Sequence, residues 1–320
     1  MLSLCLALYG LAVSPVLDPK PLREVLSLPD GLNGHRLTVD VYSGSIVYGT
    51  QKEVFRSRVL EDGGLRVHKN PDNDHLVIVG SRDQGLLVDM RTWKVRSRFS
   101  ARLAAYNSEF GLVKVFGSEL EPQRIRVGRS VRTLPKKIGF VLSITPGGDY
   151  LLTEVIGTGA DSNYSIYSIR KGGELVRVVD FEGPYREGGP GSLVRVSKDR
   201  FALEYGLSFN SYGVFTLDLF NGVGKLTVVG HREGQIEHHL QQNRRGAAAS
   251  LIEGVFPFRS TVLQIEPKRV KNLGYFDSRF GFMVTPKGEL FPYVPKERWS
   301  DELEPSPGPQ TPFTGKERRE

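Results

Sequence analysis

The chain has few residues that can form disulfides and none of the common nucleotide-binding or zinc-binding motifs. Its 320 residues include one cysteine, which excludes an intramolecular disulfide, and only three methionines and two tryptophans. The sequence has no P-loop, no GxGxxG motif that opens a helix, no nucleophile elbow and no Cys/His spacing typical of a zinc site. These absences argue against the common nucleotide-binding and zinc-binding classes, and they indicate a fold stabilised by burial.

Helical periodicity and blocks of charge are scarce as well. Few stretches place apolar residues at i, i+3, i+4 and i+7, whereas 36 glycines and 19 prolines are spread through the chain as short strands and turns require. The net charge of +7 comes from 43 basic and 36 acidic residues that are mixed along the chain. It is a modest bias toward an acidic partner, a nucleic acid or an anionic membrane surface.

What the sequence does contain is a repeat with two markers. The first is an alternating apolar run that ends in a polar residue. It occurs at 86–89, 165–174, 214–222 and 262–267, with 124–128 supplying a further copy, which gives a period of roughly 40 to 50 residues. The second is a Pro, Asp or Gly turn that leads into another strand. It occurs seven times, at 43–49, 70–79, 108–117, 145–152, 197–203, 244–252 and 285–291.

Repeats of this length with about four short strands each are typical of a β-propeller. The chain resembles a degenerate WD-repeat or YVTN-type propeller, with Val88-Asp89 at the place of that family's Trp-Asp dipeptide. No unit has a Trp-Asp or Gly-His pair in register, and the resemblance implies no active site. We predict an all-β propeller of seven blades, each of four antiparallel strands, with six or eight blades as alternatives and the ring closed by the N-terminal segment.

The domain prediction has three parts: a closure strand or extension at 1–34, the propeller at 35–299 and a Pro-rich flexible tail at 300–320. Residues 1–13 are apolar but have no Lys or Arg, so a closure strand is favoured over a cleaved secretory signal, with an anchor as a third alternative. The apolar run is too short to span a bilayer. An intracellular or assembly-bound location is favoured, and secretion follows only if residues 1–13 are a signal.

Candidate binding residues fall into two groups. Aromatic residues in turns are typical anchors for partner proteins, and Phe209, Tyr212 and Trp93 are the candidates. Basic residues at a spacing of two should share one face of a strand, where they could contact phosphates or protect an outer edge. This second group consists of Lys94, Arg96, Arg98, Arg124 and Arg126.

No catalytic, cofactor-binding or metal-binding residue is predicted. The densest set of metal-type ligands is Glu237-His238-His239, but adjacent histidines in a strand point to opposite faces, and metalloprotease chemistry needs them four apart on a helix. The sequence therefore favours a non-catalytic scaffold for protein–protein interaction, as a structural subunit of a virion, tail or surface assembly. The alternatives are a hydrolase or lyase with its site in the axial channel, and a propeller that binds nucleic acid through its Arg and Lys rows.

Overall fold

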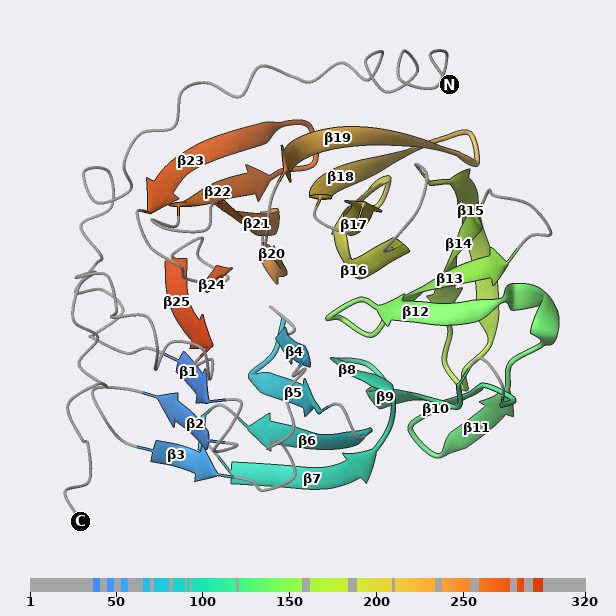
Figure 1. Cartoon of the computed structure of the whole chain (residues 1–320). Coiled ribbons are helices and arrows are strands. Elements are labelled where there is room, and N and C mark those ends of the chain that lie inside the picture. The colour runs from blue at the N-terminus through green and yellow to red at the C-terminus, as the bar shows by residue number, and fades with distance from the viewer. Residues whose placement is uncertain are drawn as a thin grey trace.

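The computed structural model of the chain is a ring of β-sheets (Figure 1). In the residues that it describes, every helix or strand is a β-strand except the 3-10 helix η3 (Lys136–Ile138). The predicted all-β propeller is confirmed. The described residues are 37–40, 45–48, 53–56, 66–69, 72–80, 83–89, 91–92, 94–118, 121–156, 162–183, 189–208, 211–233, 238–243, 245–253, 259–276, 281–284 and 290–295.

Five antiparallel units of four strands follow one another along the chain, and in each unit the first strand lies nearest the ring axis (Figure 1). The first is β4 (Arg66–Lys69), β5 (His75–Val79), β6 (Gln84–Asp89) and β7 (Lys94–Ser100). The second is β8 (Leu103–Asn107), β9 (Gly111–Phe116), β10 (Arg124–Val127) and β11 (Ser130–Thr133). The third is β12 (Phe140–Ile144), β13 (Tyr150–Ile156), β14 (Ser162–Ile169) and β15 (Leu175–Glu182). The fourth is β16 (Gly189–Ser197), β17 (Arg200–Ser208), β18 (Ser211–Phe220) and β19 (Val223–Glu233). The fifth is β20 (His238–Asn243), β21 (Gly246–Glu253), β22 (Arg259–Ile265) and β23 (Val270–Phe276).

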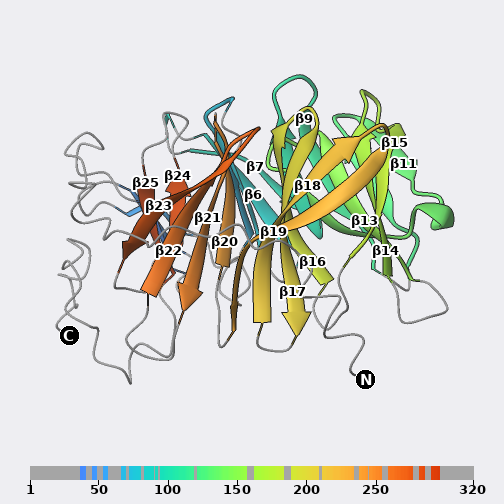
Figure 2. The same ribbon diagram turned by 90° about the horizontal axis from the view of Figure 1, so that it is seen from above.

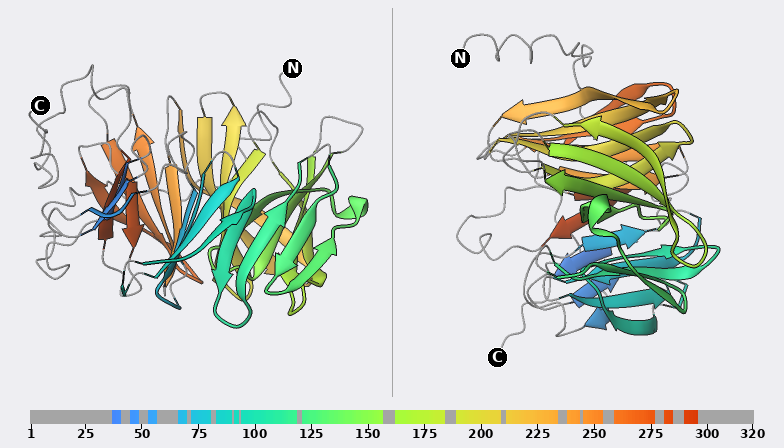
Figure 3. Two further views of the ribbon diagram at one scale, coloured as in Figure 1. Left: turned by 90° about the horizontal axis from the view of Figure 1, so that it is seen from below. Right: turned by 90° about the vertical axis from the view of Figure 1, so that its right-hand side faces the viewer.

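Both ends of the described chain build one further sheet. Its order is β24 (Gly281–Val284), β25 (Leu290–Pro295), β1 (Leu37–Asp40), β2 (Ser45–Tyr48) and β3 (Glu53–Arg56). In this sheet β1 pairs with β25 in parallel, with Leu37 opposite Tyr293, so N-terminal strands close the ring. Seen edge-on, the units stand side by side, with the strand ends at two opposite faces of the ring (Figure 2, Figure 3).

The predicted count of seven blades is not confirmed, because the strands that the structure describes form six units. The extra predicted blade comes from the closing sheet. It contains two of the seven sequence turns, one between β1 and β2 and one between β24 and β25. Sequence spacing counts such turns as two units, whereas strand pairing joins them in one. The predicted parts at residues 1–34 and 300–320 lie outside the described residues.

The hydrophobic core is divided among the boundaries between neighbouring units. One cluster joins the second and third units through Ile125, Val127, Ile144 and Ile169. Equivalent clusters occupy the boundaries between the first and second, third and fourth, and fourth and fifth units. Middle strands such as β6 are buried on both faces, which is why they appear in the sequence as nearly continuous apolar runs.

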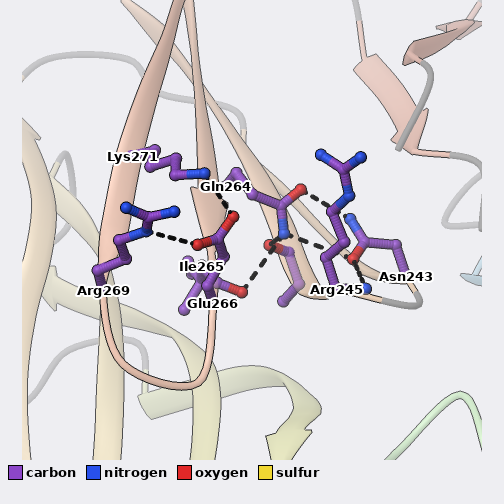
Figure 4. Close-up of polar contacts among 8 residues, drawn as sticks. Asn243, Arg245, Gln264, Ile265, Glu266, Arg269 and Lys271 are labelled. Carbon is purple, nitrogen blue, oxygen red and sulfur yellow. Dashed lines mark hydrogen bonds and ion pairs between the residues drawn. The ribbon is translucent and has the colours of Figure 1, made fainter. Parts of the chain in front are cut away.

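Buried polar side chains also link the strands within one sheet. In the fifth unit, Gln264 and Asn243 are both buried, and the Asn243 Nδ2 donates to Gln264 Oε1 at 2.9 Å (Figure 4). The Gln264 Nε2 also donates to the carbonyl oxygen of Ala247 at 2.9 Å. The amides therefore satisfy one another inside the sheet, as buried polar groups must.

The outer strands differ in one repeated detail. β3, β7, β15, β19 and β23 each shift register against the strand before them, which marks a β-bulge. β11 pairs with β10 over its four residues without a shift. Bulges twist an edge away from pairing with other chains. Among the described outer strands, β11 alone lacks this feature.

Candidate binding surface at the outer rim

The first predicted basic row lies on β7, the outer strand of its unit. Lys94, Arg96 and Arg98 are all exposed. The register shift places Lys94 opposite Asp89 and Arg98 opposite Leu86, which are three residues apart on β6. Lys94 and Arg98 therefore lie on opposite faces of the sheet, and the expected alignment of the three side chains on one face is wrong. A bulge changes the period of two on which that expectation depended.

Arg96 is used within its own sheet. Its Nε donates to Asp89 Oδ2 at 3.0 Å, and the other carboxylate oxygen of Asp89 accepts from the backbone N–H of Arg91 at 2.9 Å. The hydrogen bond from Arg96 lowers the pKa of the Asp89 carboxyl, and the backbone hydrogen bonds act in the same direction. Arg96 thus stabilises the turn between β6 and β7.

The second predicted row, on β10, does share one face. Arg124 and Arg126 are exposed and alternate with the buried Ile125 and Val127. Arg126 lies opposite Lys114 of β9. Partial burial lowers the pKa of Lys114, and the nearby Arg126 lowers it further. Because Ile125 and Val127 pack at the boundary with the third unit, Arg124 and Arg126 lie on the face of the second unit that is turned toward the first.

The predicted aromatic anchors are mostly outside the described residues. Trp93 and Phe209 are not described, and Tyr212 is described only as part of β18, where it pairs with Gly206 and Arg232. Their role as partner anchors stays a prediction.

Exposed apolar side chains lie instead in the outer parts of three consecutive units. The exposed fractions are 55% for Val131 on β11, 40% for Val176 on β15, 62% for Phe220 and 67% for Val223. These four are the large apolar residues that are exposed in the described part of the chain. Phe220 and Val223 flank the Asn221-Gly222 turn of the β18–β19 hairpin. The sequence carried the signal for that tip, since Asn-Gly between apolar runs is typical of a two-residue hairpin loop.

The β18–β19 hairpin also reaches the neighbouring unit. Val223 pairs in parallel with Asp180 of β15, which joins the third and fourth units in one eight-stranded sheet. Both Asn221 and Gly222 have positive φ, at 52° and 79°. This is the backbone of a type I′ turn, whose twist matches that of the long strands on either side.

A pocket of about 540 Å³ opens between the second and third units. β11 supplies Arg132 to one wall, and the β14–β15 hairpin supplies Tyr167, Leu175 and Arg177 to the other. Lys137 comes from η3, the short coil between β11 and β12 in Figure 1. The pocket exists because β11 ends at Thr133 and the chain turns at Pro135 into η3, while β15 continues over eight residues.

The cations of the pocket differ in how they are held. Arg132 Nε donates to the carbonyl oxygen of Gly172 at 2.7 Å, so this guanidinium spans the two units. Arg177 NH1 lies 3.1 Å from Asp180 Oδ2, with both side chains mostly exposed. Lys137 is exposed and has no hydrogen-bond or ion-pair partner in the part of the chain that is described. The sequence alone could not reveal this site because its lining comes from two units.

Close to the inner strands, charged side chains form hydrogen bonds between neighbouring units. Arg195 NH1 of the fourth unit donates to Asp149 Oδ2 of the third at 3.2 Å, and Thr145 Oγ1 donates to Asp149 Oδ1 at 2.6 Å. Burial raises the pKa of Tyr150, whose ring lies below the Arg195 guanidinium. These contacts hold the third and fourth sheets together, and they do not arrange a general acid and a general base around a common substrate position.

Within the described residues, no three His, Cys, Asp or Glu side chains gather as a metal ion would require. Of the predicted metal-type ligands, His238 and His239 belong to β20 and Glu237 is not described. The described chain contains no helix with the length and apolar character needed to cross a membrane.

Comparison with protein-family models gives no match, and comparison with curated proteins gives none either. Solved structures do match. The chain is similar to the N-terminal domain of Nup159, with 11% identity and a TM-score of 0.47 over 79% of this chain and 85% of that chain. The β-propeller domain of Cps50 (Swd1) from Myceliophteria thermophila has 10% identity and a TM-score of 0.49, over 77% and 85%. KlAtg21, in a complex with the coiled coil of AgAtg16, has 12% identity and a TM-score of 0.45, over 73% and 77%. At these identities the similarities concern the fold alone.

Proposed function

We propose that this chain is a non-catalytic propeller that binds partner proteins through its outer rim, as a structural subunit of a larger assembly. The observation that carries the proposal is an arc of exposed apolar residues in the outer parts of three consecutive units, namely Val131, Val176, Phe220 and Val223. Single exposed apolar residues are ordinary, but here the exposed large apolar side chains of the described chain share one side of the ring. Apolar and aromatic side chains dominate the binding energy of protein interfaces.

The test is affinity purification of the tagged protein from its native source, with mass spectrometry of what co-purifies. A variant in which the four apolar residues of the arc are replaced by threonine keeps the preference for β-structure and removes the apolar surface. We expect partner recovery to fall at least fivefold. Lys94→Thr, on the outer strand β7, is the matched control and should leave recovery unchanged.

Two outcomes would contradict the proposal. Recovery that is equal for the fourfold variant and the wild type would exclude the arc as the interface. A monomer with no partner would exclude the platform itself and would turn attention to ligands of the axial channel. A version that ends at Trp299 tests separately whether residues 300–320 contribute to partner binding.

A further inference from the structure

The pocket between the second and third units has the character of a specific binding site. Three cations, Arg132, Lys137 and Arg177, come from three different elements around it, against one lining carboxylate, Glu174. Apolar surface from Tyr167 and Leu175 lies among them, and the volume of about 540 Å³ is within the range of ligand-binding pockets.

We propose that this pocket binds an extended acidic segment of a partner protein, with carboxylates at its cations and an apolar side chain against Tyr167 and Leu175. The inference rests on the proposed function, because it names the partner chemistry of one site on the same rim. Among the described residues, Arg132 donates its Nε to Gly172 and its terminal nitrogens have no partner, so they remain for a carboxylate. Arginine forks match carboxylates in a bidentate geometry.

Lys137 is the second anchor for a carboxylate. It has no partner among the described residues, and the neighbouring backbone fixes its position. Pro135 leads into η3, the backbone N–H of Ile138 donates to Pro135 at 3.1 Å, and Ile138 itself is buried in the core. A lysine on a fixed backbone with its ammonium in water can bind a carboxylate without first breaking another ion pair.

The lining favours a peptide over a phosphate chain. Glu174 and the Asp180 partner of Arg177 would repel the concentrated charge of a polyphosphate more strongly than carboxylates spaced along a segment. The apolar surface between the cations suits an aliphatic or aromatic side chain. Binding of a nucleic acid strand would call for a row of stacking aromatic side chains, and the lining of this pocket includes one aromatic residue, Tyr167.

The edge of β11 fits the same kind of ligand. β11 is the terminal strand of its sheet, and it has no bulge against β10. An unbulged edge offers backbone N–H and C=O groups to an added strand. A segment held at Arg132 would lie beside this edge.

The experiment uses an array of immobilised extended peptides, each with two Asp or Glu residues beside one Leu, Ile or Phe. Matched members carry Asn or Gln in place of the acids. Full-length wild type is compared with Lys137→Glu and with the control Lys136→Glu. Both variants change the net charge by the same amount in neighbouring exposed residues of η3, but only Lys137 lines the pocket. Thermal midpoints verify that both variants fold.

We expect the wild type to bind acidic members and not their amide counterparts. Lys137→Glu should weaken this binding at least tenfold, and Lys136→Glu less than threefold. Binding to no acidic member overturns the proposal, and so does an equal loss in both variants, because net charge alone would then explain it. If no peptide bound but a labelled single-stranded oligonucleotide bound in a way that depends on Lys137, the peptide proposal would be overturned and the ligand would be a nucleic acid.

The proposed function can survive the failure of this inference. Partner proteins that depend on the apolar arc but not on Lys137 would support the platform and exclude the pocket as its site. Partners lost in both the fourfold arc variant and Lys137→Glu would place pocket and arc in one interface. The absence of partners with either form would exclude the platform, whatever the peptide array shows.

Discussion

Two boundaries between units use a similar arginine and end differently at the rim. Between the second and third units, Arg102 donates to the carbonyl oxygens of Gly117 at 3.0 Å and Val141 at 2.6 Å. Between the fourth and fifth units, Arg200 is paired with Asp218 and donates to the carbonyl oxygen of Glu266 at 3.2 Å. Both guanidinium groups join one sheet to the next close to the core.

Farther out, the first boundary opens into the pocket and the second is filled. At the second, a Cβ added to Gly230 of β19 would lie 2.5 Å from Leu251 Cδ1 and 3.0 Å from Leu263 Cδ1, so the sheets are in direct contact. β19 is eleven residues long with a register shift, whereas β11 has four residues and none. Arginine contacts thus hold the sheets together at both boundaries, while the length and twist of the outer strands decide whether a site opens between them.

The largest expected effect is at the filled boundary. Gly246 has φ of +131°, and an added Cβ would overlap the carbonyl oxygen of Ile265 and lie 2.8 Å from Val196 Cγ1. Gly246→Ala should therefore cost about 3–4 kcal/mol of unfolding free energy, from backbone strain and steric overlap. Urea denaturation measures the loss. Gly111→Ala, at φ of +81° with nothing within 4 Å, should cost only about 1 kcal/mol. Equal losses would show that the second boundary is not tightly packed.

The second-largest expected effect is that of replacing Arg102 at the open boundary. Arg102→Ala removes charge-assisted hydrogen bonds to Gly117 and Val141 and leaves those carbonyls without this donor. We expect a loss of about 2 kcal/mol in unfolding free energy. Arg124→Ala, an exposed arginine in the same unit, should change it by less than about 0.5 kcal/mol. If Arg102→Ala lost no more stability than Arg124→Ala, Arg102 would not hold the second and third units together, and its role would differ from that of Arg200.

The smallest expected effect concerns the pH dependence of the filled boundary. Hydrogen bonds from Arg269 Nε at 2.7 Å and Lys271 Nζ at 2.8 Å lower the pKa of the Glu266 carboxyl below its ordinary 4.5 (Figure 4). A carboxyl whose pKa is lower in the folded state contributes stability above the unfolded pKa and loses it as pH falls through the folded pKa.

Glu266→Gln should accordingly lower the thermal midpoint at pH 7, and the difference from wild type should shrink between pH 5 and pH 2. Melting curves across that range measure the difference. Glu109→Gln, an exposed residue in a turn of the second unit, is the control and should shift the midpoint little at any pH. A difference that stayed constant down to pH 2 would contradict the assignment.

Much of the fold was predictable because strand pairing repeats along the chain. The polar residues that end the alternating runs, Asp89, Asp218 and Glu266, do lie within the last three residues of the third strand of a unit or directly after it. Asp218 and Glu266 carry ion pairs with cations of their own units. Such positions are local, so one stretch of sequence contains both the strand and the turn that define them.

Other features could not be predicted because they depend on pairing between distant segments. The turn between β1 and β2 looks like the start of a separate unit until β1 is seen beside β25. The bulge in β7 moves Lys94 and Arg98 to opposite faces, although their spacing is even. The rim pocket depends on how far β11 and β15 run, and its lining residues, Arg132 and Arg177, are distant in sequence.

The pairing of Leu37 with Tyr293 has a consequence for how the protein is made. During synthesis, β1 to β3 leave the ribosome before the other described strands, yet their sheet lacks β24 and β25 until the end of the described chain has emerged. The five internal units can form in order as they appear, since each consists of consecutive strands. The last step joins segments of very large sequence separation, so we expect it to be slow, and until then the edge of β1 that pairs with β25 stays open to other chains.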